Sequence, residues 1–152
     1  MQTNKEHWTK AAFRIYSETK NIEDICAKIN TLPTVHHEKG EFLVKGNPKS
    51  KVRKENLWIL DSVLSDQETL ESHIGYFLSF LRENAKGIQE LHAECEFDIF
   101  CSYSSENGQG GFTLKHETLK ELAVYPVDLS IDLYPPEGNG ESYAANLMPT
   151  SG

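Results

Sequence analysis

An unbroken alternation of apolar and polar residues near the end of the chain constrains the fold most. It runs for eight residues, from Val127 to Tyr134. Successive side chains of a β-strand point to opposite faces, so this pattern predicts a strand with one buried side and one solvent-facing side. The side chains predicted to face the core are Val127, Leu129, Ile131 and Leu133.

The first half of the chain predicts three strands and a helix. Alternation over residues 11–16 predicts the first strand, and apolar residues at helical spacing predict a helix over residues 22–29, capped by Asn21 and stopped before Pro33. Residues 41–45 and 57–60 predict two further strands. The second of these has apolar residues on both faces, which favours an interior position in the sheet.

The second half predicts a long helix followed by two strands separated by a shorter helix. Ser65 and Glu68 form the pattern of a capping box ahead of a helix over residues 70–81, with one more short turn near residues 88–91. Alternation predicts a strand over residues 95–103. Asn107-Gly108 then predicts a hairpin with a brief return strand over residues 112–114, and a helix follows near residues 119–123.

This order of elements predicts an α+β sandwich with a mainly antiparallel sheet and helices on one face. It resembles a ferredoxin-like unit extended by one helix and one strand. The expected organisation is an N-terminal arm over residues 1–10, a single domain over residues 11–134 and a flexible tail over residues 135–152, where three prolines and three glycines interrupt any periodicity.

Charge and cysteine content narrow the function classes. The 152 residues include 15 basic and 23 acidic side chains, so the net charge is −8, which opposes nucleic acid and anionic membranes and favours basic partners. No segment has the apolar length of a membrane span or a signal core, and three cysteines without CxxC spacing predict neither a disulfide framework nor a zinc knuckle. We therefore expect a cytoplasmic protein.

A basic cluster interrupts this acidic background. Its five members lie within ten residues that contain no acid: Lys45, Lys49, Lys51, Arg53 and Lys54. Such a loop could bind phosphate or an acidic partner surface, although a solvated hairpin loop is the commoner explanation. Because the cluster contains no aromatic residue that could stack on bases, we expect no nucleic-acid partner.

Three other groups of polar residues have both a functional and a structural interpretation. His36-His37-Glu38 could ligate a metal ion only from a loop, because consecutive strand residues point apart, and a polar loop is favoured. Gly108, Gly110 and Gly111 could cradle phosphate, but they match no nucleotide motif and favour a turn. Asp128 and Asp132 share the polar side of the last strand and could act as an acid and base, although alternation alone explains them.

Several segments resemble one bacterial family. They are Leu32-Pro33-Thr34, Lys39-Gly40-Glu41, residues 58–62, residues 71–81, and Glu117-Thr118-Leu119 together with Ile131-Asp132-Leu133-Tyr134. Over residues 11–134 the chain is similar to the family known as domain of unknown function 4279. The resemblance implies a small bacterial cytosolic α+β protein with no established activity, and it supplies no functional residue.

The sequence favours a protein-binding module over an enzyme. One concrete form of such a module is an immunity-like or antitoxin-like protein. The alternative is a small enzyme or ligand-binding protein with a pocket near the basic loop and Trp58. We identify no catalytic residue, metal ligand set or cofactor, and oligomeric state stays open. The candidate binding residues are Lys49, Lys51, Arg53, Lys54, His36, His37 and Trp58.

Overall fold

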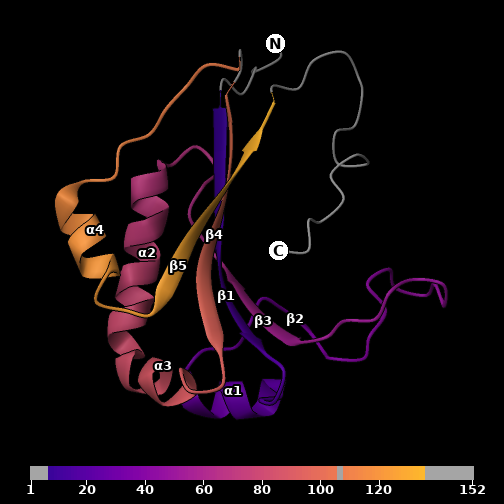
Figure 1. The fold of residues 1–152 in the computed structure, drawn as a ribbon. Coiled ribbons are helices and arrows are strands. Elements are labelled where there is room, and N and C mark those ends of the chain that lie inside the picture. Colours follow the sequence, from indigo (N-terminus) through magenta and orange to yellow (C-terminus); the bar gives the residue numbers. More distant parts are fainter. Residues whose placement is uncertain (1–6, 106–107, 136–152) are drawn as a thin grey trace.

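The computed structural model describes residues 7–105 and 108–135, and these contain five strands and four helices (Figure 1). The elements in chain order are β1 (His7–Ser17), α1 (Ile22–Lys28), β2 (Val35–His37), β3 (Asn56–Asp61), α2 (Leu70–Glu83), α3 (Ala85–Leu91), β4 (Glu96–Ser105), α4 (His116–Leu122) and β5 (Val127–Tyr134). Residues 1–6 and 136–152, within the predicted arm and tail, lie outside the described residues. In the described part, no helix is long and apolar enough to span a membrane.

The five strands form one open sheet in the order β2-β3-β1-β4-β5. β1 runs antiparallel to both β3 and β4, β2 runs antiparallel to β3, and only β5 runs parallel to its neighbour, β4. This arrangement confirms the predicted α+β class with a mainly antiparallel sheet. Up to β4 the element order is β-α-β-β-α-α-β, which is that of a ferredoxin-like unit with one additional short helix, α3. The relation to that fold stays a prediction.

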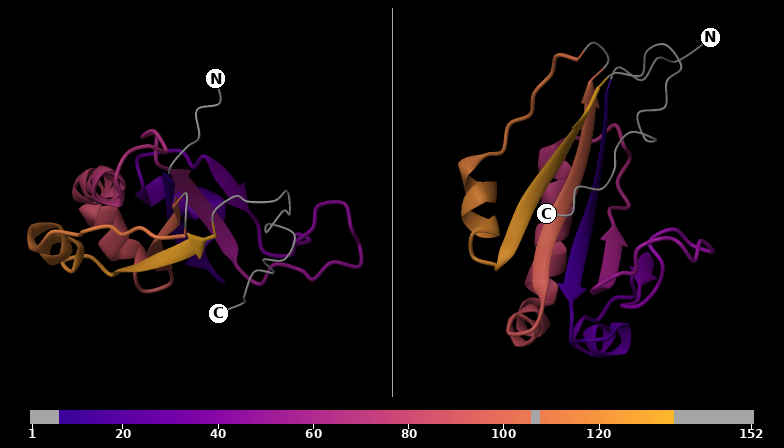
Figure 2. Two further views of the ribbon diagram at one scale, coloured as in Figure 1. Left: turned by 90° about the horizontal axis from the view of Figure 1, so that it is seen from above. Right: turned by 45° about the vertical axis from the view of Figure 1, so that its right-hand side comes forward.

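The hydrophobic core lies between one face of the sheet and the helices (Figure 2). Alternate residues of β1 are fully buried, among them Phe13 and Ile15, while Arg14 between them points to the other face. The Phe13 ring lies 5.2–6.4 Å from the rings of Trp58, Phe77, Phe80 and Phe97, measured between centroids. This aromatic cluster fixes α2 against the centre of the sheet, because aromatic side chains bury large areas and pack in preferred geometries.

The predicted capping box of α2, at Ser65 and Glu68, is wrong by about one turn, because the helix begins at Leu70. Thr69 caps the helix by accepting a 3.1 Å hydrogen bond from the Ser72 amide, whereas the Ser65 hydroxyl accepts from the Gln67 amide in a preceding turn. The cause is a backbone hydrogen bond of 2.7 Å from the Thr9 amide to the Asp66 carbonyl, which holds this segment along the edge of β1. The chain can therefore enter the helix only after Asp66.

The predicted strand over residues 41–45 is wrong, and a strand forms earlier, at Val35–His37. Thr34 fixes that earlier segment beside β3: its amide donates to the Ile59 carbonyl at 2.7 Å, and its hydroxyl accepts from the Asp61 amide at 2.9 Å. Residues 41–45 instead belong to a long loop, in which Phe42 and Val52 form a single isolated bridge.

The brief return strand predicted at residues 112–114 does not form. The Lys115 amide there donates to the Glu71 carboxylate of α2 at 3.1 Å, so the chain follows the helix rather than β4. Asn107, half of the predicted turn, lies outside the described residues.

β5 forms over the predicted residues and lies at one end of the sheet. Val127, Leu129 and Ile131 are half-buried and pack against the core, as the alternation predicted. Leu133 is an exception, since 71% of it is exposed although it lies on the core side. Its neighbour on β4 is Tyr103, whose ring packs against Phe112 of the segment that precedes α4.

Candidate functional site

The sheet face that points away from the helices carries most of the charged groups of the strands. Residues directly paired across strands lie on the same face, so the register defines this surface, which we call the open face. It presents five carboxylates, from Asp61, Glu96, Asp98, Asp128 and Asp132, against two cations, from Lys10 and Arg14. All four helices contribute buried apolar residues to the core on the opposite side.

Arg14 and Asp98 form the central ion pair of the open face. The guanidinium donates two hydrogen bonds to the carboxylate, at 2.8 and 2.6 Å. Burial alone would lower the pKa of Arg14, but the hydrogen bond and charge of Asp98 raise it above its usual value. Because a bidentate, partly desolvated pair is both strong and directional, it holds Arg14 in one orientation.

Aromatic rings flank this ion pair. The Arg14 guanidinium carbon lies 4.2 Å from the centroid of the Phe100 ring and 5.1 Å from that of Tyr16, both cation–π distances. Burial raises the pKa of Tyr16 to about 12, and the negative charge of Asp98 adds to the effect. Tyr16 is therefore a neutral phenol at physiological pH.

Four exposed carboxylates surround this centre. Asp61 is the last residue of β3, Glu96 is the first residue of β4, and Asp128 and Asp132 lie on β5. All four side chains are exposed to solvent. The sequence analysis placed Asp128 and Asp132 on one polar side, and the register confirms this, since they pair with Asp98 and Ser102 of the same face. What the sequence missed is that β3 adds Asp61 and β4 adds Glu96 and Asp98 to the same face.

The basic cluster lies outside the strands that form the open face. Its residues occupy the loop between β2 and β3, which extends away from the sheet (Figure 1). The Leu43 amide donates to the Lys51 carbonyl, and the Arg53 amide donates to the Glu41 carbonyl, both at 2.8 Å, so the loop is an irregular hairpin. Lys49, Lys51 and Lys54 are exposed and Arg53 is half-buried. Their binding role stays a prediction.

His36 and His37 lie on β2 and therefore point to opposite faces, as expected for consecutive strand residues. Nδ1 of His37 lies 3.8 Å from a carboxylate oxygen of Glu41. Burial lowers the pKa of His37, and the positive charge of Arg53 lowers it further. Among residues 7–105 and 108–135, no group of three or more potential ligands could hold a metal ion.

Trp58 lies in the hydrophobic core with none of its side chain exposed. Its ring contacts those of Phe13 and Phe80, at centroid distances of 6.4 and 6.1 Å. A ligand could reach the ring only by displacing core residues. The position of Trp58 therefore does not support the pocket predicted near the basic loop and this residue.

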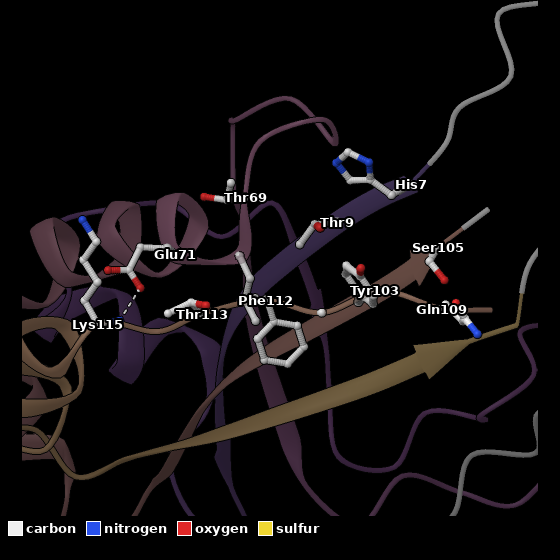
Figure 3. A pocket seen from close by; sticks show the side chains of 13 residues that line it. His7, Thr9, Thr69, Glu71, Tyr103, Ser105, Gln109, Phe112, Thr113 and Lys115 are labelled. Atoms are coloured by element: carbon white, nitrogen blue, oxygen red, sulfur yellow. Dashed lines mark hydrogen bonds between the residues drawn. The ribbon is translucent and has the colours of Figure 1, made fainter. Parts of the chain in front are cut away.

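The described residues line an open cavity of about 960 Å³ elsewhere, at the N-terminal end of α2 (Figure 3). Glu71 lies at one end of it and accepts hydrogen bonds from the Lys115 amide, at 3.1 Å, and from the Thr118 hydroxyl, at 2.5 Å. The rings of Tyr103 and Phe112 pack edge to face across it, 5.7 Å apart. The remaining lining residues are His7, Thr9, Thr69, Leu70, Ser105, Gln109, Gly110, Gly111, Thr113 and Lys115.

Two of the three glycines considered as a phosphate cradle border this cavity. A Cβ atom at Gly110 would lie 2.3 Å from the Tyr103 hydroxyl and 3.0 Å from Cβ of Ser105, so Gly110 packs closely against β4. Gly108 has a positive φ of 76°, which favours glycine in a turn. Both observations support the structural interpretation of these residues.

One buried polar pair lies beside the edge of β1. Nδ1 of His73 lies 2.8 Å from the Ser62 hydroxyl, and only 1% of His73 is exposed. Burial lowers the pKa of His73, so the ring is neutral at physiological pH. The pair links α2 to the segment that follows β3, and it fixes this part of the backbone.

The three cysteines of the chain are free. Cys95 and Cys101 are buried, and burial raises the pKa of Cys101 to about 12. A thiol with so high a pKa is a weak nucleophile at neutral pH. These residues therefore contribute to packing.

The fold and the open face define a small α+β domain with one helical layer and one polar sheet surface. A family model described as "Domain of unknown function (DUF4279)" matches residues 6–136, and the chain belongs to this family. No curated protein and no solved structure matches the chain.

Proposed function

We propose that this protein is a protein-binding module whose open face holds a basic protein partner. The observation that supports this proposal most directly is the excess of carboxylates on that face, five against two cations, with Asp61, Glu96, Asp128 and Asp132 all exposed. Complementary charge speeds association and excludes partners of the wrong sign.

The open face also offers anchors for the side chains of such a partner. Trp8 and Tyr134 lie side by side at one end, with ring centroids 5.4 Å apart. Lysine and arginine bind both carboxylates and aromatic faces, and Lys10 already lies 5.5 Å from the Trp8 ring. Interfaces depend on a few aromatic and arginine anchors, and this face combines them with acidic groups.

An immunity-like or antitoxin-like role is the concrete form of this proposal. A basic effector that acts on nucleic acid needs its cationic surface free, and an acidic face that covers this surface would inhibit it. The net charge of −8 suits such a role because it attracts the effector at long range. A cytoplasmic location in a bacterial cell, where the effector would be neutralised, accords with the proposal.

Affinity capture tests this proposal directly. The immobilised protein is exposed to an extract of the source organism, and the proteins retained are compared between wild type and the variant Asp128→Asn/Asp132→Asn. The matched control, Glu23→Gln/Glu83→Gln, loses the same charge from exposed positions on α1 and α2. We expect a basic protein that is retained by wild type and by the control and is lost from the open-face variant.

The proposal fails if the open-face variant retains the same partner as wild type. It also fails if DNA or RNA binds at physiological salt and that binding disappears when Lys49, Lys51, Arg53 and Lys54 are all replaced by alanine. Nucleic-acid binding through the basic cluster should weaken steeply as salt increases.

The cavity beside Glu71 supports a second candidate, a ligand-binding protein or small enzyme. It combines a carboxylate with the hydroxyl groups of Thr9, Thr69 and Tyr103 (Figure 3). Both oxygens of Glu71 already accept hydrogen bonds from the protein, so its first role is to fix α4 and the preceding segment to α2. The open face is therefore the better supported site.

A further inference from the structure

β5 is the long edge strand of the sheet. It pairs with β4 over all eight of its residues, from Val127 beside Phe97 to Tyr134 beside Ser104. Among the described residues no strand pairs with its other edge, because β5 stands last in the sheet order (Figure 1). Half of the backbone N–H and C=O groups of an edge strand point outward and can accept a further strand.

Several features that normally protect such an edge are absent from β5, although it carries two charged residues, Asp128 and Asp132. Charged side chains, above all lysine, discourage strand addition, as do proline and bulges, and short edge strands limit it. Between Val127 and Tyr134 the sequence contains no lysine or proline, and the pairing with β4 advances one residue at a time without a bulge. At the opposite end of the sheet, β2 has only three residues.

The side chains of β5 specify what kind of strand could be added. On the open face, Asp128 and Asp132 are exposed and lie two positions on either side of Ser130. On the core side, Leu129 and Ile131 are only half-buried, and 71% of Leu133 is exposed. An added strand would therefore meet carboxylates on one side and incompletely buried apolar groups on the other.

We propose that β5 accepts an extended segment of a basic partner as a sixth strand, in which lysine or arginine alternates with valine, isoleucine or leucine. This inference rests on the proposed function and specifies how the partner is held. The cations of the segment pair with Asp128 and Asp132, and its apolar residues cover Leu129, Ile131 and Leu133. Backbone hydrogen bonds supply the affinity that is common to strand addition, and the alternating side chains supply specificity.

The β5 strand of a second copy of this chain would pair with the free edge of β5 less favourably than a basic segment. Antiparallel pairing about Ser130, which keeps polar and apolar sides matched, sets Asp128 of one copy opposite Asp132 of the other. Like charges directly opposite each other destabilise a strand pair. The full-length register, with Val127 opposite Tyr134, instead sets Asp128 opposite Leu133. A register centred on Ile131 avoids both mismatches, but it leaves Asp128 and Asp132 without a cation, because β5 contains no lysine or arginine. A basic segment supplies these cations and avoids both mismatches.

The test uses synthetic peptides as probes of the full-length protein. The first peptide alternates Lys and Val. The second has the same composition with the lysines and valines in separate blocks, and the third is the alternating peptide with every backbone amide N-methylated. We expect saturable binding of the first peptide alone, with slower hydrogen exchange of the β5 amides in its complex, because only this peptide has both the pattern and the backbone donors.

Charge reversal provides the matching protein variants. In Asp128→Lys/Asp132→Lys, the affinity for the Lys-Val peptide should fall at least about tenfold, and a peptide alternating Glu and Val should bind instead. The control Glu23→Lys/Glu83→Lys should keep the wild-type preference. Equal melting temperatures of the two variants establish that both are folded, which is expected because all four positions are exposed.

Equal binding of the N-methylated or the block peptide would overturn strand addition and leave the proposed function standing, since charge on the open face alone would then suffice. Dimerisation through β5 that blocks peptide binding would also overturn it. If no peptide binds while affinity capture still depends on Asp128 and Asp132, the inference fails alone. If capture is insensitive to these residues, the proposed function itself is wrong.

Discussion

Two apolar residues that are direct neighbours across β4 and β5 should differ strongly in their contribution to stability. Ile99 and Leu129 are paired in the parallel register and lie on the core side of the sheet. Ile99 has no exposed surface because β1, β5 and the helices surround it, whereas Leu129 lies on the edge strand and is only half-buried. Alanine at each position therefore removes a similar side chain from two different environments.

The expected losses follow from burial. A fully buried Leu or Ile replaced by alanine loses about 2–5 kcal/mol, because both the transfer free energy and the energy of the remaining cavity are lost. We expect Ile99→Ala in the upper half of this range. Leu129→Ala should cost only about 1–2 kcal/mol, since part of its surface already contacts water and the space it leaves opens to solvent. The alternating pattern alone, which implies full burial, would place Leu129 in the same range as Ile99.

Urea unfolding at constant temperature measures both values, with the slope of free energy against urea concentration as a check of two-state behaviour. Asp132→Ala, at an exposed position of the same strand, is the control and should change stability by no more than about 0.5 kcal/mol. Equal losses for Ile99→Ala and Leu129→Ala would refute the reasoning, because they would show that β5 is covered as completely as β4. The proposed strand addition at its edge would then lose its structural basis.

Three further predictions concern single interactions. Thr69→Ala should destabilise the protein by about 1 kcal/mol because it removes the cap of α2, and Ser65→Ala should cost less; chemical denaturation measures both. Purified protein should contain no stoichiometric zinc, and chelator should not change the melting temperature; one equivalent of zinc by elemental analysis, lost in His36→Ala or His37→Ala, would contradict this. Burial lowers the pKa of folded His73 below 6.5, so the unfolded chain binds a proton more readily than the folded protein as the pH falls. The free energy of unfolding of the wild type should therefore decrease from pH 7 toward pH 5. The decrease should be less steep in His73→Gln, which lacks this titrating group.

Local patterns predicted the elements whose side chains repeat regularly. The helical spacing of Leu70, Ile74, Phe77 and Leu81 gave α2, and alternation gave β1, β4 and β5, because burial on one side imposes a period on the sequence. The predicted strand at residues 41–45 shows the limit of such patterns. Its apolar residues are exposed in a loop, Phe42 at 41%, Leu43 at 44% and Val44 at 57%, and nothing within the segment indicates that.

The candidate site was predictable only where it lies within one strand. Alternation placed Asp128 and Asp132 on the same side of β5, and the structure confirms this. Arg14 and Asp98 are 84 residues apart, and their ion pair depends on the register between β1 and β4, which no local pattern specifies. Trp58 illustrates a second limit, since sequence alone did not show that this aromatic residue, proposed to line a pocket, lies fully buried in the core.

Strand periodicity also cannot distinguish an edge strand from one with neighbours on both sides, and this distinction determines what β5 can do. The period of two reports only that one side of a strand is apolar, whichever strands lie beside it. Leu133 illustrates the consequence, because it continues the apolar side of β5 and yet 71% of it is exposed. Its exposure accords with two facts beyond the strand itself, namely that β5 ends the sheet and that Tyr103, its partner on β4, lies near the end of that strand. The same two facts leave backbone groups, carboxylates and apolar side chains together at one edge, and this combination, rather than any motif, is the basis for expecting a basic strand there.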